Sequence, residues 1–317
     1  MRRRKQLAII WKGVMFDSSP KSNLIILNDH FKSRNGSEKI FYKIIKGNES
    51  CQNSFVLLHD LGDYHFYQNN LINFLLSYFK QDINIGLMDY KGHGLSSGPR
   101  GHAADLKEFV DDLFFFLDSI FSKMILPGQK YFIFAPGLSG LCLLRLLQTK
   151  EEYLLSKIQG IIFINPMIKP KIAPPFLIRR LTKKWVKNFG KLRCSLPNKF
   201  EIESDIAMVA TLSSDPLVLS SISLSLMNAI LKESELIRKS SFFYDGLTLF
   251  MLSGDDVISD SEITKVLHKG MRKKYSTLFF YKEMKHDILN SKNSSLALKD
   301  LENWFEKNGC HGYKTNH

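Results

Sequence analysis

The sequence predicts an α/β protein with a mostly parallel, doubly wound sheet and an inserted helical cap. Over residues 54–166, and again over 247–306, short apolar runs alternate with longer segments that carry apolar residues at helical spacing. Between residues 167 and 242 this alternation stops and helical patterns take over. A parallel sheet with right-handed crossover helices, interrupted by one insertion, explains both observations.

The predicted elements follow one another in a regular order. Residues 24–27 and 39–45 form an antiparallel pair around the turn at Asn35-Gly36. The short apolar runs are typical of parallel strands buried on both faces, and they cover residues 54–58, 83–88, 131–134, 161–164, 247–252 and 277–281. The predicted helices cover residues 68–79, 105–121 and 294–306, and another directly follows the strand at 131–134.

The length of 317 residues suits one large α/β domain with an insertion. We expect a basic N-terminal extension (1–20), a core (21–166 and 243–310), a helical cap (167–242) and a tail (311–317). The four cysteines have no metal-ligand spacing, so we expect reduced thiols and no metal site. No apolar run approaches the roughly 20 residues that span a bilayer, and no secretory signal follows the N-terminal arginines. These features predict a cytoplasmic protein.

The positive charge is concentrated in the predicted cap. The chain carries a net charge of +13, and residues 169–199 contain ten Lys or Arg and no Asp or Glu. This pattern indicates either attraction to an anionic surface or a solvated insertion in a basic protein. Nucleic-acid binding is disfavoured, because the chain has neither a recognition motif nor an interleaved series of aromatic residues.

One segment of the predicted cap has the pattern of a helix at a membrane surface. Leu177, Leu181 and Trp185 are spaced four apart and share one helical face, while Arg180 and Lys184 belong to the basic face. Peripheral contact with an anionic membrane is one interpretation. The alternative is an ordinary cap helix that packs its apolar stripe on the core.

The segment YFIFAPGLSGLCLL, residues 131–144, combines an apolar strand, a tight turn and an apolar helix. Turns of this kind hold a strained central residue and need small residues two positions away on each side. With Gly137 at the centre, Ala135 and Ser139 meet this requirement. With Ser139 at the centre, one flanking residue would be Leu141, which is too large. We therefore place Gly137 at the apex, where glycine tolerates the strained backbone but offers no nucleophile.

Six motifs in a fixed order resemble one family. They are HDLG at 59–62, DYKGHGLSSGPRG at 89–101, the turn at 135–140, DPLV at 215–218, SGDDVI at 253–258 and KHD at 285–287. Together they resemble the monoacylglycerol lipase and lysophospholipase branch, of the serine aminopeptidase type, of the α/β-hydrolases. The resemblance extends from about residue 24 to residue 304 and is strongest at 89–101. It implies an α/β-hydrolase fold with a cap.

The resemblance also implies roles for individual residues. In that family a serine attacks the acyl carbonyl of a glycerolipid ester, a histidine takes its proton and an aspartate orients the histidine. By position, Asp256 is the acid, His286 is the base, and the backbone N–H groups of Leu61 and Leu138 are the oxyanion donors. Gly137 occupies the position of the nucleophile.

Two further departures from the family pattern oppose catalysis. Pro136 stands where the family usually has histidine, and Asp60 stands at the second position of an HG-x-G motif. If Asp60 points inward, its carboxylate repels the negative charge that develops in acyl transfer by about 4 kcal/mol. That repulsion corresponds to about a thousandfold in rate.

The sequence therefore favours a catalytically silent relative that binds an acyl lipid, such as a monoglyceride or a lysophospholipid. Three alternatives stay open: an active carboxylic-ester hydrolase that uses Ser139 or another serine, slow hydrolysis by a water that His286 polarises near Gly137, and a scaffold for a protein partner. Nothing in the sequence indicates a metal, nucleotide or flavin cofactor.

Overall fold

The computed structural model describes residues 24–48, 51–149, 152–172, 190–203, 205–240 and 244–310. The predicted N-terminal extension and the tail at 311–317 lie outside these ranges. So do the candidate membrane-facing residues of the cap, which are Leu177, Arg180, Leu181, Lys184 and Trp185.

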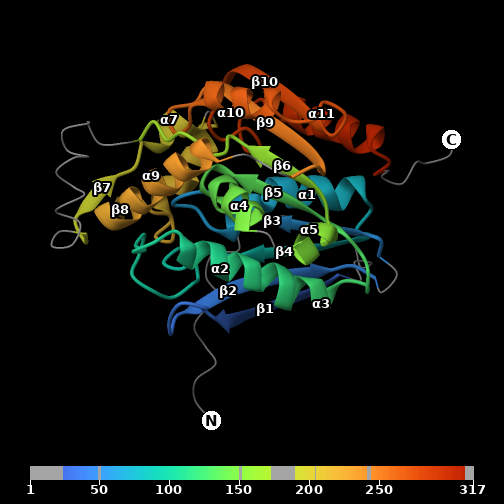
Figure 1. The fold of residues 1–317 in the computed structure, drawn as a ribbon, viewed down its shortest axis with the longest axis horizontal. Helices are drawn as coiled ribbons and strands as arrows, with labels where there is room; N and C mark the ends of the chain where they lie inside the picture. The colour runs from blue at the N-terminus through green and yellow to red at the C-terminus, as the bar shows by residue number, and fades with distance from the viewer. Residues whose placement is uncertain are drawn as a thin grey trace, which may run out of the picture.

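An eight-stranded sheet forms the centre of the molecule, with the strand order β1-β2-β4-β3-β5-β6-β9-β10 (Figure 1). β1 (Ile25–Lys32) and β2 (Lys39–Lys46) pair antiparallel around the predicted turn, and β2 also pairs antiparallel with β4. The remaining pairs are parallel, which confirms the predicted fold class. The parallel strands are β3 (Asn53–Leu57), β4 (Ile83–Met88), β5 (Tyr131–Pro136), β6 (Ile158–Ile164), β9 (Leu247–Asp255) and β10 (Ser276–Lys285).

β9 and β10 are several residues longer than their apolar runs predict. Their pairing continues past the buried stretch to Asp255 and Lys285. The apolar pattern marks only the buried part of a strand, whereas backbone pairing extends further. This extension carries both strands toward the residues that follow them, among which are Asp256 and His286.

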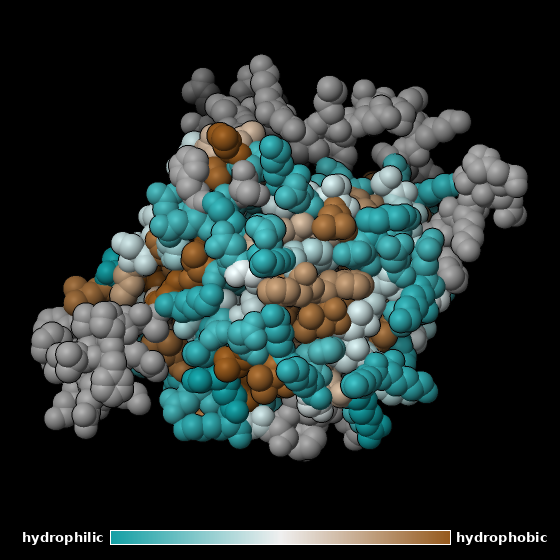
Figure 2. Space-filling view, turned by 90° about the horizontal axis from the view of Figure 1, so that it is seen from above, coloured by the Kyte–Doolittle hydropathy of each residue, from teal (hydrophilic) through white to brown (hydrophobic). Residues whose placement is uncertain are grey.

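Helices cover both faces of the sheet. Their bounds in the core are η1 (His65–Gln68), α1 (Asn69–Tyr78), α2 (Lys107–Phe115), the π-helix η2 (Phe116–Phe121), α3 (Ser122–Met124), α4 (Gly137–Thr149), α5 (Glu152–Lys157), α10 (Ser261–Lys269) and α11 (Ser294–Lys307). The single helix predicted over 105–121 is therefore an α-helix that continues as a π-helix. Helix α11 buries Trp304 and Phe305 and leaves Lys299 exposed. The face shown in Figure 2 is largely hydrophilic, with apolar patches that do not merge into one surface.

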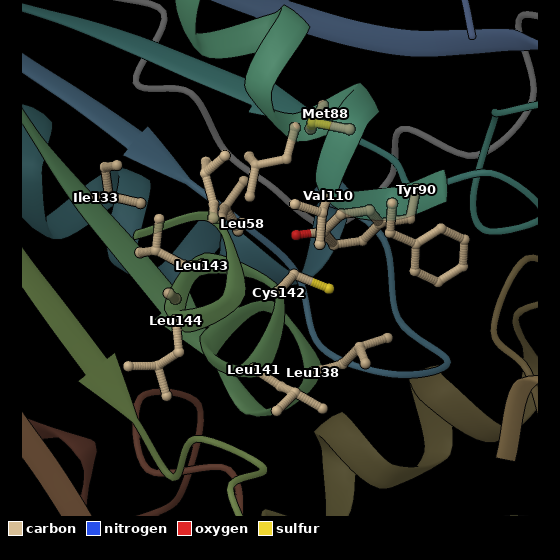
Figure 3. Close-up of a cluster of buried hydrophobic side chains, with 14 of the residues drawn as sticks. Leu58, Met88, Tyr90, Val110, Ile133, Leu138, Leu141, Cys142, Leu143 and Leu144 are labelled. Atoms are coloured by element: carbon tan, nitrogen blue, oxygen red, sulfur yellow. The ribbon is translucent and has the colours of Figure 1, made fainter. Parts of the chain in front are cut away.

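Two apolar layers pack on opposite faces of the sheet, and β5 contributes to both. Ile133 and Ala135 belong to the layer that contains α2, α4 and α9, whereas Phe132 and Phe134 belong to the layer that contains α1 and α11. Figure 3 shows the first layer around α4, where Cys142 lies near Val110 and Tyr90. Because β5 and the first two turns of α4 are buried, the turn between them is packed tightly.

The segment predicted as a cap contains both helices and strands. Its described elements are β7 (Arg193–Ser195), α7 (Lys199–Ile202), α8 (Ile206–Ser214), β8 (Ser221–Ser223) and α9 (Leu224–Lys239). β7 and β8 form an antiparallel pair that the sequence did not predict. An ion pair between Arg145 of α4 and Glu233 (3.2 Å) ties helix α9 (Figure 1) to the core. The hydroxyl of Ser234 also donates to the carbonyl of Ile168, at the start of the predicted cap. None of the described helices is long and apolar enough to cross a membrane.

Candidate functional site

The turn between β5 and α4 has the form that the sequence indicates. Gly137 is the first residue of α4 and has φ +40°, in the left-handed region that favours glycine. A Cβ at Gly140 would lie 2.6 Å from the Cβ of Pro166, so the helix packs too closely here for a larger residue. The apex of the turn is therefore residue 137, and it carries no side chain.

Ser139 lies two residues, or about half a turn, further along α4. Its side chain is fully buried, and its hydroxyl donates a hydrogen bond to the carbonyl of His59. This contact ties α4 to the segment after β3. The geometry does not place Ser139 at the apex of the turn, where the alternative nucleophile would have to be.

Asp256 and His286 come together as the sequence predicts. They follow the neighbouring parallel strands β9 and β10, whose carboxyl ends meet at one edge of the sheet. Nδ1 of His286 donates to Oδ1 of Asp256 over 2.8 Å. The same oxygen accepts the backbone N–H groups of Ile258 (2.7 Å) and Ser259 (3.0 Å), which hold the carboxylate in place.

Asp60 points into the site and bonds both to His286 and to the start of α4. Its Oδ2 accepts a hydrogen bond from Nε2 of His286 over 2.6 Å. Its Oδ1 accepts the backbone N–H groups of Leu61 and Leu138, each over 2.6 Å. Those are the two N–H groups that the family resemblance identifies as oxyanion donors. A carboxylate of the protein itself therefore accepts the two N–H groups to which the resemblance assigns an oxyanion.

The same carboxylate fills the space that a side chain at residue 137 would need. A Cβ built on Gly137 would lie well under 3.0 Å from Oδ1, Cγ and Oδ2 of Asp60. No residue larger than glycine fits at 137 while Asp60 holds this position. The glycine at 137 and the aspartate at 60 therefore form one arrangement, in which Asp60 fills the space that the missing side chain of Gly137 leaves.

The register of two strands brings Asp60 and Gly137 together. β3 and β5 are parallel neighbours in which Leu57 is paired with Phe134. Asp60 and Gly137 each lie three residues beyond that pair, so the strand register brings them to the same edge of the sheet. The pairing of β3 with β5 could not be read from the chain order, because β4 lies between them in sequence.

The charges of the site follow from these contacts. Burial raises the pKa of Asp60, but the hydrogen bond and charge of His286 and the two backbone N–H groups outweigh it and hold the pKa below its usual value. For His286, burial lowers the pKa, and the carboxylates of Asp256 and Asp60 raise it well above its usual value. The resting site at neutral pH is therefore an imidazolium between carboxylates. An imidazolium cannot act as a general base.

His59 fixes the backbone of Asp60. Its Nδ1 donates to the carbonyl of Asp60 (2.8 Å), and its Nε2 accepts the backbone N–H of Tyr90 (2.9 Å). Burial lowers the pKa of this histidine, so it is neutral and its tautomer is defined by these two contacts. His59 is thus a structural residue that positions the loop from which Asp60 projects.

A cavity of about 70 Å³ lies beside Asp60 and His286. Its walls are mainly apolar and come from both the core and the predicted cap, as shown by Pro136, Ile164, Leu196 and Leu212. Among the residues that the structure describes, no group of His, Cys, Asp and Glu could hold a metal ion.

Comparison with known proteins places the chain in a family. The model of the serine aminopeptidase S33 family of hydrolases matches residues 50–293. A monoacylglycerol lipase of Paleococcus ferrophilus has the same fold, with a TM-score of 0.69 and 22% identity over 90% of this chain and 99% of that one. A soluble variant of the monoglyceride lipase of Saccharomyces cerevisiae gives a TM-score of 0.75 and 19% identity over 91% of this chain and 97% of that one.

Two curated relatives are much longer than this chain. The uncharacterized protein YnbC of Escherichia coli K12 is 22% identical over 287 residues, which are 90% of this chain and 48% of YnbC. An uncharacterized abhydrolase domain-containing protein of Dictyostelium discoideum is 23% identical over 74% of this chain and 24% of its own length. This chain therefore spans half or less of each. The family match covers most of the sequence, and the chain belongs to the serine aminopeptidase S33 family of α/β-hydrolases.

Proposed function

We propose that this chain is a family member without serine-hydrolase activity that binds an acyl lipid at the cavity beside Asp60. The observation that carries this proposal is the carboxylate of Asp60, which accepts both candidate oxyanion donors and overlaps the space of a side chain at 137. An ester carbonyl cannot enter a hole that is already filled by an anion.

The expected loss of ester hydrolysis is large because several requirements fail together. Without its serine, a triad retains about a millionth of its activity in the best-studied case. Loss of a single oxyanion donor costs about a hundredfold to a thousandfold. Here both donors are engaged by Asp60, and His286 is held as an imidazolium.

Slow hydrolysis by a water near Gly137 has less support than the absence of hydrolase activity. The space in which that water would lie holds the carboxylate of Asp60. His286 donates both of its ring N–H groups to carboxylates, so it has no free lone pair with which to polarise a water.

Support for an acyl ligand comes from the apolar cavity walls and from the lipases that share this fold. A volume of about 70 Å³ holds only a small group. Sites for larger ligands usually measure about 300–1,000 Å³. A whole acyl chain therefore requires the predicted cap to move away from the core.

Two measurements test the proposal. A fluorophosphonate probe should leave the pure protein unlabelled, and covalent labelling at any one serine would refute the absence of serine-hydrolase activity. Native mass spectrometry should detect an acyl lipid that is lost in Leu196→Asp, which introduces a charge into the cavity wall. Leu192→Asp is the matched control, because Leu192 is 55% exposed and does not line the cavity. If the native protein carries no lipid, or if both variants retain the lipid equally, lipid binding at this cavity is refuted.

A further inference from the structure

One edge of the sheet carries a concentration of positive charge. β10 is the outermost strand there and α10 packs beside it; both lie at the top of Figure 1 and therefore face the viewer in Figure 2. Residues 265–285, from α10 to the end of β10, contain seven Lys or Arg and one Asp or Glu. The basic residues are Lys265, Lys269, Arg272, Lys273, Lys274, Lys282 and Lys285, and the acidic residue is Glu283. We call this set, with Val266 and Phe280, the basic edge.

Most of the charge of the basic edge is not neutralised by ion pairs. Lys265 pairs with Glu262 over 2.7 Å. Arg272 pairs with Asp245 over 3.4 Å, and both of these side chains are exposed, so the pair is weak. The exposed lysines that form no ion pair with any described residue are Lys269, Lys273, Lys274 and Lys282. This excess of exposed cations attracts a negatively charged partner.

Two exposed apolar side chains lie among these lysines. Val266 of α10 is 64% exposed, and Phe280 of β10 is 41% exposed. Nζ of Lys265 lies 3.4 Å from the centre of the Phe280 ring, so the ammonium group covers one face of the ring. Because Lys265 directly precedes Val266, this contact also brings the two apolar residues to the same edge.

The mixture of basic and apolar side chains favours a bilayer over other partners. At the boundary between lipid head groups and acyl chains, cations meet phosphates while apolar side chains leave water. A single-stranded nucleic acid stacks its bases on free aromatic faces, and Lys265 covers one face of Phe280. A second copy of the chain would bring like charges together, which is unfavourable. An anionic bilayer matches both kinds of side chain.

We propose that the basic edge is a docking surface for an anionic lipid bilayer. Its lysines contact the negatively charged head groups, and Val266 and Phe280 enter the interface beside them. Each lysine near such a surface strengthens binding by about fivefold. The basic edge includes none of the residues that line the cavity beside Asp60, so docking there does not require the proposed lipid ligand. It is also separate in sequence from the cap segment with Leu177 and Trp185.

Flotation with phosphatidylcholine vesicles, with and without phosphatidylserine, measures the binding. The native protein should float with the anionic vesicles only, and added salt should release it. The triple variant Lys269→Gln, Lys273→Gln, Lys282→Gln should lower the partition coefficient by about a hundredfold, because three charges are lost. Val266→Ser should lower it by about fivefold, because less apolar surface enters the interface. All four side chains are exposed, so these variants should fold as the native protein does.

Two matched variants locate the surface, and each removes the same amount of charge as the triple variant. The first changes three exposed lysines of β1, β2 and α3, toward the opposite edge of the sheet, by Lys32→Gln, Lys39→Gln and Lys123→Gln. The second changes the cap segment that has the pattern of a membrane helix, by Arg180→Gln, Lys183→Gln and Lys184→Gln. Each should lower the partition coefficient by less than about threefold, because the basic edge stays intact.

A loss of vesicle binding in either matched variant that equals the loss in the triple variant would overturn the inference. Absence of flotation with anionic vesicles would also overturn it, whether or not the native protein binds duplex DNA instead. Native mass spectrometry of the triple variant should still detect the acyl lipid of the proposed function. Failure of membrane docking and failure of the proposed ligand are therefore separate results.

Discussion

Three buried histidines lie at the carboxyl end of this sheet, and His286 differs in charge from His59 and His93. His286 donates to the carboxylates of Asp60 and Asp256, and these raise its pKa well above the usual value. His93 bonds the backbone carbonyl of Lys91, and burial lowers its pKa to about 3. Burial also lowers the pKa of His59, which bonds only backbone groups. Burial is similar in all three, so the partner atoms decide the charge.

The difference indicates which part of the site is built for charge. His59 and His93 lie on the separate segments that follow β3 and β4, and both are neutral side chains that bond backbone groups. The site around His286 is an ion cluster, in which removal of one member leaves buried charge without a partner. Variants at these positions should therefore differ in stability and in pH dependence.

The largest expected difference is in the free energy of unfolding. His286→Ala leaves the carboxylates of Asp60 and Asp256 without their shared cation and should destabilise the protein by about 3–5 kcal/mol. His93→Ala removes one hydrogen bond to a carbonyl and should cost about 1–3 kcal/mol. Urea unfolding at pH 7 measures both. An equal or smaller loss for His286→Ala would remove the distinction between the two groups.

The pH dependence of stability should have opposite signs in the two groups. The folded pKa of His286 lies above its unfolded value, so its contribution is complete below pH about 6.5 and is lost as the pH rises through the folded pKa. The folded pKa of His93 lies below its unfolded value, so its contribution is complete above pH about 6.5 and is lost as the pH falls toward 3.

Each of these two histidines should change the free energy of unfolding by about 1.4 kcal/mol per pH unit in its own pH range. His286→Gln should flatten the decline above about pH 6.5, and His93→Gln should flatten the decline between about pH 4 and 6. Unfolding in urea across this range gives both slopes. A change in the same range for both variants would contradict the assigned charges.

The smallest change in stability is expected at Asp255, next to the ion cluster around His286. Asp255 precedes Asp256 and is exposed, whereas Asp256 is buried and bonded to His286. Asp255→Asn should change the free energy of unfolding by no more than about 0.5 kcal/mol. A loss of unfolding free energy comparable to that of His286→Ala would show that Asp255 also belongs to the ion cluster.

Much of the fold could be predicted from the sequence, because its strands are apolar runs of characteristic length. The turn at Gly137 could also be predicted from its small residues, and the meeting of Asp256 with His286 could be predicted from the family resemblance. The position of the Asp60 carboxylate could not. It depends on the register of β3 with β5, which are neighbours in the sheet but not in the chain. The short pair β7 and β8 was missed because three-residue strands carry no periodic signal.

The most direct test of the account is a double-mutant cycle at residues 60 and 137. Gly137→Ser alone should destabilise the protein by about 3–5 kcal/mol, because the added Cβ displaces a buried, paired carboxylate. Adding Asp60→Gly should recover about 2 kcal/mol or more of this loss, and only the double variant should be labelled by fluorophosphonate at position 137. Free energies that add within about 0.5 kcal/mol would show that the two positions are independent and would contradict the account.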